Sequence, residues 1–140
     1  MIKGIRWVLL GASIFSFALA AEEKGVDCEQ AVSTLEVNEC LGQEFDLAWA
    51  ELARYLDVIY ARHKEDPLLV DEIRAAQQDW ETYADSHCGS IYTYWREGSI
   101  RNTLAISCGI RLTRQRTHEL WQSFLTHMDS TPPVLPEPAR

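Results

Sequence analysis

Four cysteines constrain the fold of this chain more than any other feature of its sequence: Cys28, Cys40, Cys88 and Cys108. An even number of cysteines in a small exported domain predicts disulfide bonds, each of which stabilises the fold by about 3 kcal/mol because it restricts the unfolded chain. The alternative is a structural zinc site. Spacings of twelve and twenty residues lack the close cysteine pairs that such a site needs. We therefore expect two disulfides, no metal and no other cofactor.

Export is predicted from the N-terminal residues. Lys3 and Arg6 form a short basic region, residues 7–20 form an apolar stretch, and Ala18-Leu19-Ala20 provides a small-x-small cleavage pattern. We expect residues 1–20 to be a signal peptide, and the mature protein to be periplasmic or secreted with no stable membrane anchor. An uncleaved anchor is the alternative, which the lack of a stop-transfer pattern disfavours.

The chain is acidic, with 21 Asp and Glu against 13 Lys and Arg and a formal net charge of −8. Loss of the two basic residues of the signal peptide would change this to about −10. An acidic domain disfavours nucleic acid and anionic lipid as partners and favours a cationic protein. The alternative is that the charge serves only to keep the surface solvated.

The first predicted helix begins at a capping box. The Ser33 hydroxyl is placed to accept from the amide of Glu36, whose carboxylate reaches back to the start of the helix. Apolar side chains then recur every three or four residues, which puts them on one face: Leu41, Phe45, Ala48, Leu52, Leu56 and Ile59. We expect this helix to end near His63.

The same periodicity predicts two further helices. Asp66 and Pro67 suit the N-cap and first position of the second helix, which should end near Cys88 with Gly89 as its stop. Its apolar face comprises Leu69, Ile73, Ala76, Trp80 and Tyr83. The third helix should run from about Thr103 to Met128, with an apolar face of Ile106, Ile110, Thr113, Thr117, Leu120, Phe124 and Met128. No segment alternates with the period of a strand, so we predict an all-α fold, a three-helix up-down-up bundle stapled by two disulfides.

Bundle topology limits the cysteine pairing only in part. The start of the first helix, the end of the second and the start of the third meet at one end of such a bundle, so all four cysteines gather there. Cys28 could double back to reach Cys40, while a bond between Cys88 and Cys108 would close the loop between the second and third helices. We favour these two local pairs, and the crossed pairings remain open.

The loop expected between the second and third helices, residues 89–102, is long for a small bundle. It holds Tyr92, Tyr94, Trp95 and Arg96, residue types that dominate the binding energy of protein interfaces. This loop is our candidate partner-binding site. The alternative is that its aromatic side chains fold back and cover the end of the bundle.

The last residues, 130–140, hold four of the five prolines: Pro132, Pro133, Pro136 and Pro138. Such a composition predicts an extended, disordered tail. A single helical domain would then span residues 21–129.

Catalytic motifs are not found in the sequence. The four histidines, at positions 63, 87, 118 and 127, form no HExxH motif, and there is neither a GxSxG elbow nor a glycine-rich phosphate loop. We therefore expect no catalytic residues and a protein that is not an enzyme. Two carboxylates brought together by the fold, as in a glycoside hydrolase, would leave no such motif, so an unrecognised hydrolase is kept as an alternative.

Three motifs in order, which include all four cysteines, resemble the LprI-like lysozyme-inhibitor domain family and cover nearly the whole mature chain. The matching residues are Cys28, Ala31, Ser33, Thr34, Glu36, Asn38 and Cys40, then Ala76, Gln77, Trp80, Tyr83, Asp85 and Cys88, then Gly98, Ser99, Cys108, Leu112, Thr113, Arg116 and Leu120. The chain departs from the pattern at Trp49 and Ala53, where an Asp and an Asn are common, and at Ala84, where an Arg is common.

The resemblance implies a small helical, cysteine-bridged domain of the bacterial envelope and, for a founding member, inhibition of lysozyme. Most of the motif residues have a structural interpretation. Trp80 and Tyr83 should fill the core, and Thr113 and Arg116 should tie the third helix to its neighbours. We also expect Arg116 to pair with Asp85 inside the bundle.

The function we expect from these features is that of a periplasmic or secreted protein-binding module that inhibits a lysozyme. Lysozymes are usually basic, so an acidic inhibitor would be steered toward them. Arg96 would oppose the two catalytic carboxylates of the enzyme, and Tyr94 or Trp95 would lie where sugars stack. The alternative is an envelope accessory or interaction protein with no enzyme target.

Overall fold

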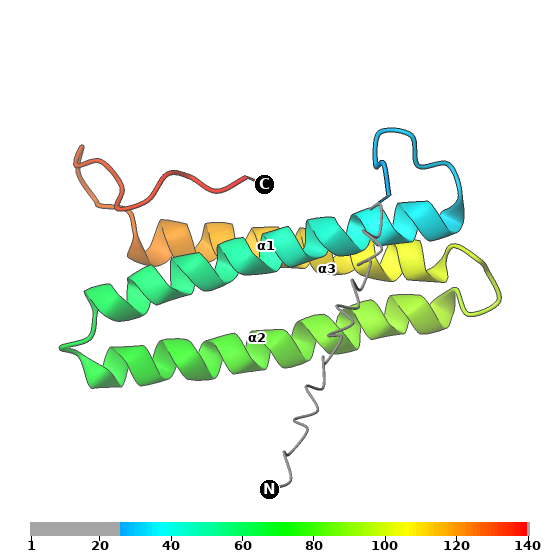
Figure 1. Ribbon diagram of the computed structural model, residues 1–140. Helices are drawn as coiled ribbons and strands as arrows, with labels where there is room; N and C mark the ends of the chain where they lie inside the picture. The colour runs from blue at the N-terminus through cyan, green and yellow to red at the C-terminus, as the bar shows by residue number, and fades with distance from the viewer. Residues whose placement is uncertain (1–25, 140) are drawn as a thin grey trace, which may run out of the picture.

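The computed structural model describes residues 26–139 of the chain. This part contains three helices, α1 (Thr34–Arg62), α2 (Pro67–Tyr94) and α3 (Arg101–Phe124), and no strand. α1 and α3 run in the same direction, and α2 runs the opposite way (Figure 1). The predicted all-α, up-down-up bundle is confirmed. The predicted signal peptide, residues 1–20, lies outside the described residues.

α3 is the central element of the bundle, because it packs along both α1 and α2. The core cluster lies toward the end of the bundle at which residues 63–66 connect α1 to α2. The buried residues that form it are Leu52, Tyr55, Leu56, Ile59, Ile73, Leu120 and Leu125. α1 supplies four of these and α2 only Ile73. α2 is therefore held mainly by its contact with α3.

The capping box at the start of α1 is confirmed. The Ser33 hydroxyl accepts from the Glu36 amide at 3.2 Å, and the Glu36 carboxylate accepts from the amides of Ser33 at 2.9 Å and Val32 at 3.2 Å. These hydrogen bonds, above all the one from the Ser33 backbone, lower the pKa of Glu36 because they favour its charged form. Local polar chemistry thus fixes where α1 begins.

α2 begins where the sequence predicts but ends later. Asp66 caps its start, with the Asp66 carboxylate accepting from the Leu69 amide at 3.2 Å. The helix then continues through Gly89 to Tyr94, so the predicted stop at Gly89 is wrong. A glycine that ends a helix takes a positive φ, and no glycine in residues 26–139 has one.

The connection between α2 and α3 is consequently short. It comprises residues 95–100, rather than the long loop of residues 89–102 that the sequence predicts. α3 starts two residues earlier than expected and ends at Phe124, four residues before the predicted end at Met128, whose side chain is fully exposed. The change moves Tyr92 and Tyr94 from a loop onto the last turn of α2.

Both favoured disulfides are confirmed. Cys28 is bonded to Cys40 with an S–S distance of 2.06 Å, and Cys88 is bonded to Cys108 at 2.09 Å. The first bond ties the segment before α1 to the second turn of that helix. The second joins α2 directly to α3 beneath the turn between them, so the two helices are covalently linked at this end of the bundle.

The C-terminal segment differs from the disorder that its composition predicts. It is extended, but it turns back along α1 and α3 (Figure 1). The Val134 amide donates to the Leu125 carbonyl at 2.8 Å, and the Trp121 indole N–H donates to the Leu135 carbonyl at 2.9 Å. The Leu135 side chain packs on the core cluster. Prolines restrict the unfolded segment, so less entropy is lost when these contacts order it.

Candidate functional site

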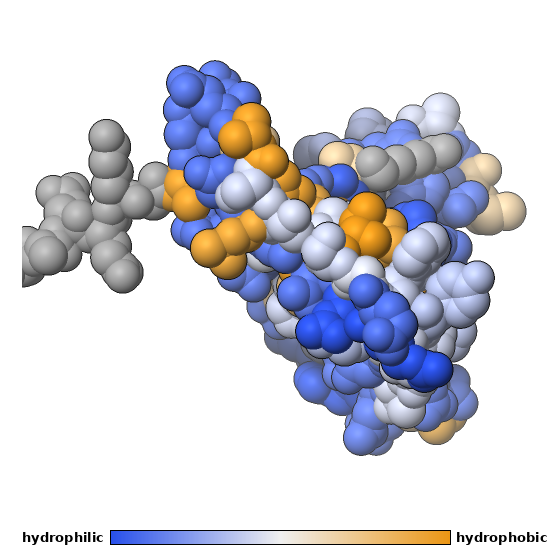
Figure 2. Space-filling view, turned by 90° about the vertical axis from the view of Figure 1, so that its right-hand side faces the viewer, coloured by the Kyte–Doolittle hydropathy of each residue, from blue (hydrophilic) through white to orange (hydrophobic). Residues whose placement is uncertain are grey.

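The candidate partner-binding residues lie together at the end of the bundle. Tyr92 and Tyr94 belong to the last turn of α2, Trp95 is its C-cap and Arg96 follows in the turn; we call these four residues the aromatic turn. None of the four is buried, since Tyr94 is 81% and Trp95 45% exposed. The rings of Tyr94 and Trp95 meet edge to face with centroids 5.5 Å apart. Viewed from this end, the bundle shows separate apolar patches among polar side chains (Figure 2).

Arg101, which the sequence reasoning missed, organises the aromatic turn from the first position of α3. Its guanidinium donates to the Arg96 carbonyl at 3.0 Å and lies 5.0 Å from the centroid of the Tyr92 ring. The Gly98 amide adds a hydrogen bond of 2.8 Å to the Trp95 carbonyl. An arginine close to aromatic residues was the only signal in the sequence, and it names no partner by itself. The aromatic turn is therefore held in place by contacts from Arg101 and Gly98.

A groove lies between α1 and α2, with α3 as its floor, and has a volume of about 690 Å³. Phe45 and Trp49 of α1 face Trp80 of α2, and the Trp49 ring centroid lies 6.1 Å from each of the other two rings. Tyr92 lines one part of the groove and also belongs to the aromatic turn. We call this feature the α1–α2 groove; the sequence reasoning did not find it.

The expected roles of Trp80 and Tyr83 are corrected by this arrangement. Trp80 is half-buried in the wall of the α1–α2 groove and packs against the core, but Tyr83 is 54% exposed and stacks on His87 at 5.5 Å. The face of α2 that meets α3 follows Ile73, Gln77 and Trp80, and Tyr83 lies to one side of that line. Tyr83 therefore does not fill the core.

The expected ion pair between Arg116 and Asp85 is not formed. Arg116 instead donates from Nε to the side-chain oxygen of Gln77 at 3.1 Å and pairs with Glu119 at 3.9 Å. Burial is the main cause that lowers the pKa of Arg116. Gln77 is buried and donates in turn to the Glu81 carboxylate at 3.1 Å. Arg116 thus links α3 to α2 as expected, but through an amide.

Thr113 and Asp85 both line the α1–α2 groove, but Thr113 is buried and Asp85 is exposed. Thr113 is buried in α3, where its carbonyl accepts from the Thr117 hydroxyl at 2.9 Å, and it forms part of the groove floor. Asp85 is exposed and lines the wall of the same groove. The carboxylate that was expected to be paired inside the bundle therefore faces the groove.

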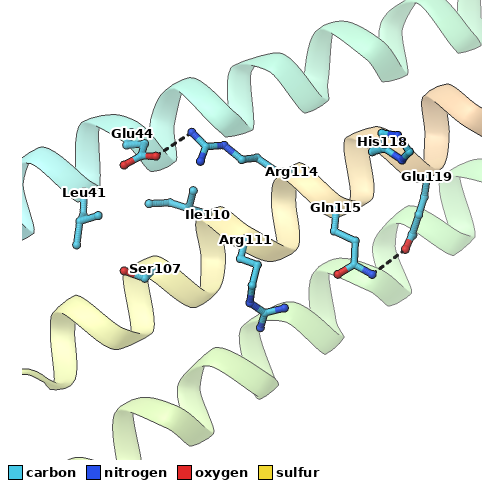
Figure 3. Close-up of a pocket in the computed structure, with 9 residues that line it drawn as sticks. All are labelled: Leu41, Glu44, Ser107, Ile110, Arg111, Arg114, Gln115, His118 and Glu119. Carbon is cyan, nitrogen blue, oxygen red and sulfur yellow. Dashed lines mark hydrogen bonds and ion pairs between the residues drawn. The ribbon is translucent and has the colours of Figure 1, made fainter. Parts of the chain in front are cut away.

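A second hollow, of about 630 Å³, lies between α1 and α3 (Figure 3). Several of its polar side chains have partners. Arg114 contacts the Glu44 carboxylate at 2.8 Å, Gln115 donates to Glu119 at 3.1 Å, and His118 lies 2.9 Å from Glu137 of the C-terminal segment. Most of the polar side chains that line this hollow therefore already have partners.

The described residues, 26–139, contain no helix that is long and apolar enough to cross a membrane. No group of three or more metal-binding side chains gathers there either.

Comparison with known proteins places the chain in a family. The model of the family described as lysozyme inhibitor LprI matches residues 27–120. The chain belongs to this family. An uncharacterised protein of Rhizobium meliloti (strain 1021) is similar to it, with 33% identity over 111 residues, which are 71% of this chain and 80% of that protein. No solved structure matches the chain. The LprI match includes both disulfides, the aromatic turn and the α1–α2 groove.

The positions at which we expect this chain to differ from the common pattern of the family lie mainly in the groove. Trp49 and Ala84, two of the three departing residues, line it. The third, Ala53, is exposed on α1. All three residues lie inside helices, Trp49 and Ala53 in α1 and Ala84 in α2.

Proposed function

We propose that this LprI domain acts outside the cytoplasm, binds a lysozyme or a related muramidase, and blocks it. The observation that carries the proposal is the match of residues 27–120 to the family of a lysozyme inhibitor. Two disulfides support a location outside the cytoplasm, because such bonds persist in oxidising compartments. The disulfides also make the bundle rigid, which lowers the entropy lost on binding.

The aromatic turn is the surface that we propose for contact with the enzyme. Tyr94 and Trp95 are exposed with their rings in edge-to-face contact, and the side chain of Arg96 is paired only loosely, at 3.8 Å from the exposed Glu97. A guanidinium suits the two carboxylates with which glycoside hydrolases act. The neighbouring rings would occupy the part of the cleft where sugars stack.

Electrostatics supports the same partner. The formal net charge of the chain is −8, so a basic lysozyme would be attracted over a distance of about one Debye length. Inhibition should therefore weaken as salt is added, mainly because association becomes slower.

The test is a titration of the purified, oxidised protein against a panel of lysozymes, with activity on cell-wall substrate as the readout. Arg96→Ala and Trp95→Ala should each weaken inhibition about tenfold or more. Arg62→Ala, at the opposite end of the bundle, is the matched control and should leave inhibition unchanged. Absence of inhibition across the panel would contradict the proposal. Recovery of a resident envelope protein instead of a lysozyme, in a pull-down from envelope extract, would support the accessory function. Unchanged potency of both variants would remove the aromatic turn from the mechanism.

A further inference from the structure

The α1–α2 groove combines aromatic walls with open access to solvent. Trp49 is 39% exposed although it lies in a concave surface, and Tyr92 is also exposed at the groove's edge. Ala84, Ala105 and Ile106 add further apolar surface to the lining. Exposed aromatic surface in a hollow of this size is typical of a site that a ligand or partner covers.

All charged side chains that line the groove are carboxylates. They are Asp46 of α1 and Asp85 and Glu81 of α2, and the lining contains no lysine, arginine or histidine. Asp46 and Asp85 are exposed, so their charges are available to a partner. The groove is therefore complementary to positive charge and repels anions.

The groove is already formed in the unbound protein. The disulfide between Cys88 and Cys108 joins its wall to its floor. On the floor, a Cβ at Gly109 would lie 2.9 Å from Cε2 of Phe45, so this glycine lets the Phe45 ring sit directly on α3. In the wall, a Cβ at Gly89 would meet no atom within 4 Å, which shows open space there. A preformed site of this kind loses little entropy on binding.

We propose that the α1–α2 groove binds a basic segment of a partner protein that carries a large apolar side chain. The apolar side chain enters beside Trp49 and Tyr92, and flanking lysine or arginine side chains pair with Asp46 and Asp85. A sugar would need a whole free ring face, whereas Trp49 already has two aromatic neighbours. The inference does not depend on the partner being a lysozyme.

The probe is a synthetic amphipathic peptide of leucine and lysine, titrated calorimetrically into the oxidised protein at low salt. Asp46→Lys combined with Asp85→Lys should weaken binding about tenfold or more. The matched control is Asp57→Lys combined with Asp79→Lys, which reverses two exposed charges on the same two helices away from the groove and should have a smaller effect. The indole N–H signals of Trp49 and Trp80 should shift in NMR spectra on binding.

A second pair of variants tests the apolar part of the site without removing any contact. Gly89→Phe adds a ring in the open space of the groove wall and should weaken peptide binding about tenfold. Gly42→Phe is the control, since its Cβ also meets no atom within 4 Å but Gly42 does not line the groove. Equal affinity of the Gly89→Phe variant and the Gly42→Phe control would overturn the inference.

Two other outcomes would also overturn the inference. One is that a peptide with glutamate in place of lysine binds as tightly as the basic peptide. The other is that the basic peptide fails to bind while a chito-oligosaccharide binds with dependence on Trp49, which would make the groove a glycan site. Because the probe is not an enzyme, peptide binding without lysozyme inhibition would reject the proposed function alone, and inhibition without peptide binding would reject this inference alone.

Discussion

The phenolic hydroxyl of Tyr55 donates a hydrogen bond of 2.6 Å to the backbone carbonyl of Pro136, 81 residues further along the chain. Tyr55 is only 1% exposed and belongs to the core cluster. Its hydroxyl would lose this partner if the C-terminal segment moved away. The segment therefore completes the polar chemistry of the core.

Tyr55→Phe tests this relationship. Loss of the hydrogen bond should lower the free energy of unfolding by about 1 kcal/mol, measured by urea denaturation. The Val134 amide, which bonds to the Leu125 carbonyl, should exchange with solvent faster because the segment is less firmly held. Tyr94→Phe is the control, because the side chain of Tyr94 is largely exposed. Unchanged exchange at Val134 in Tyr55→Phe would show that the segment is held without the phenol.

Acid should destabilise the protein in part through Glu36. Its pKa in the folded protein is below the ordinary value of 4.5, so its contribution to stability is present above 4.5 and is lost as the pH falls through the lowered folded value. The Glu36→Gln variant has no carboxylate at this position, so acidification cannot remove the stabilisation that the charged Glu36 provides. Its free energy of unfolding should therefore fall less steeply than that of the natural protein below pH 4.5. Glu39→Gln on the same helix is the control, and equal slopes for all three proteins would contradict the prediction.

Two glycines inside helices should respond differently to alanine. At Gly42 of α1 a Cβ meets no atom within 4 Å, so Gly42→Ala should stabilise the protein by about 1 kcal/mol through helix propensity. At Gly109 of α3 the Cβ would lie 2.9 Å from the Phe45 ring, which contacts Trp49 and must shift. Gly109→Ala should therefore gain nothing or lose stability in chemical denaturation. An equal gain at both positions would show that the Phe45 ring moves freely.

Arg101→Ala should loosen the aromatic turn with little damage to the bundle. The variant loses the hydrogen bond to the Arg96 carbonyl and the contact with the Tyr92 ring, which together contribute about 1 kcal/mol at an exposed site. If the aromatic turn binds a lysozyme, inhibition should weaken several-fold while the helical circular dichroism signal is retained. Arg111→Ala, further along the same helix, is the control. Full inhibition by Arg101→Ala would mean that inhibition does not need the contacts of Arg101 with the aromatic turn.

Local chemistry explains why much of the fold could be predicted from the sequence. The starts of α1 and α2 are set by Ser33 and Asp66, whose side chains bond to amides three residues away. Topology predicted only that the four cysteines gather at one end of the bundle, because three alternating helices bring one helix end and two helix starts together there; the two local pairs were the favoured choice among the possible pairings. These features need no knowledge of which side chains meet across the bundle.

Features that depend on contacts between helices were predicted less well. The face that α2 buries is set by its contact with α3, where Arg116 reaches Gln77, and this contact leaves Tyr83 at the surface. Gly89 lies inside α2, which continues to Tyr94, and it does not adopt the positive φ of a helix-ending glycine. Proline-rich composition likewise cannot show that Tyr55 and Trp121 offer donors to the carbonyls of the last residues.

The candidate site divides in the same way. The four residues of the aromatic turn are close in sequence, so their grouping could be predicted from composition alone. The α1–α2 groove draws its lining from three helices, and Trp49 and Asp85 lie far apart in the sequence. Only the packing of α3 against both other helices shows that they share one surface.

The position of α3 also has a consequence for how the chain folds. α1 and α2 make their main helix contacts with α3, which comes last of the three in the sequence. In any process that delivers the chain from its N-terminus, the first two helices must wait for the last third of the protein before their apolar faces are covered. Chaperones that hold newly delivered chains would therefore bind the exposed apolar faces of α1 and α2 before α3 arrives. A truncation within α3 should be highly destabilising, although it removes only the C-terminal part of the chain.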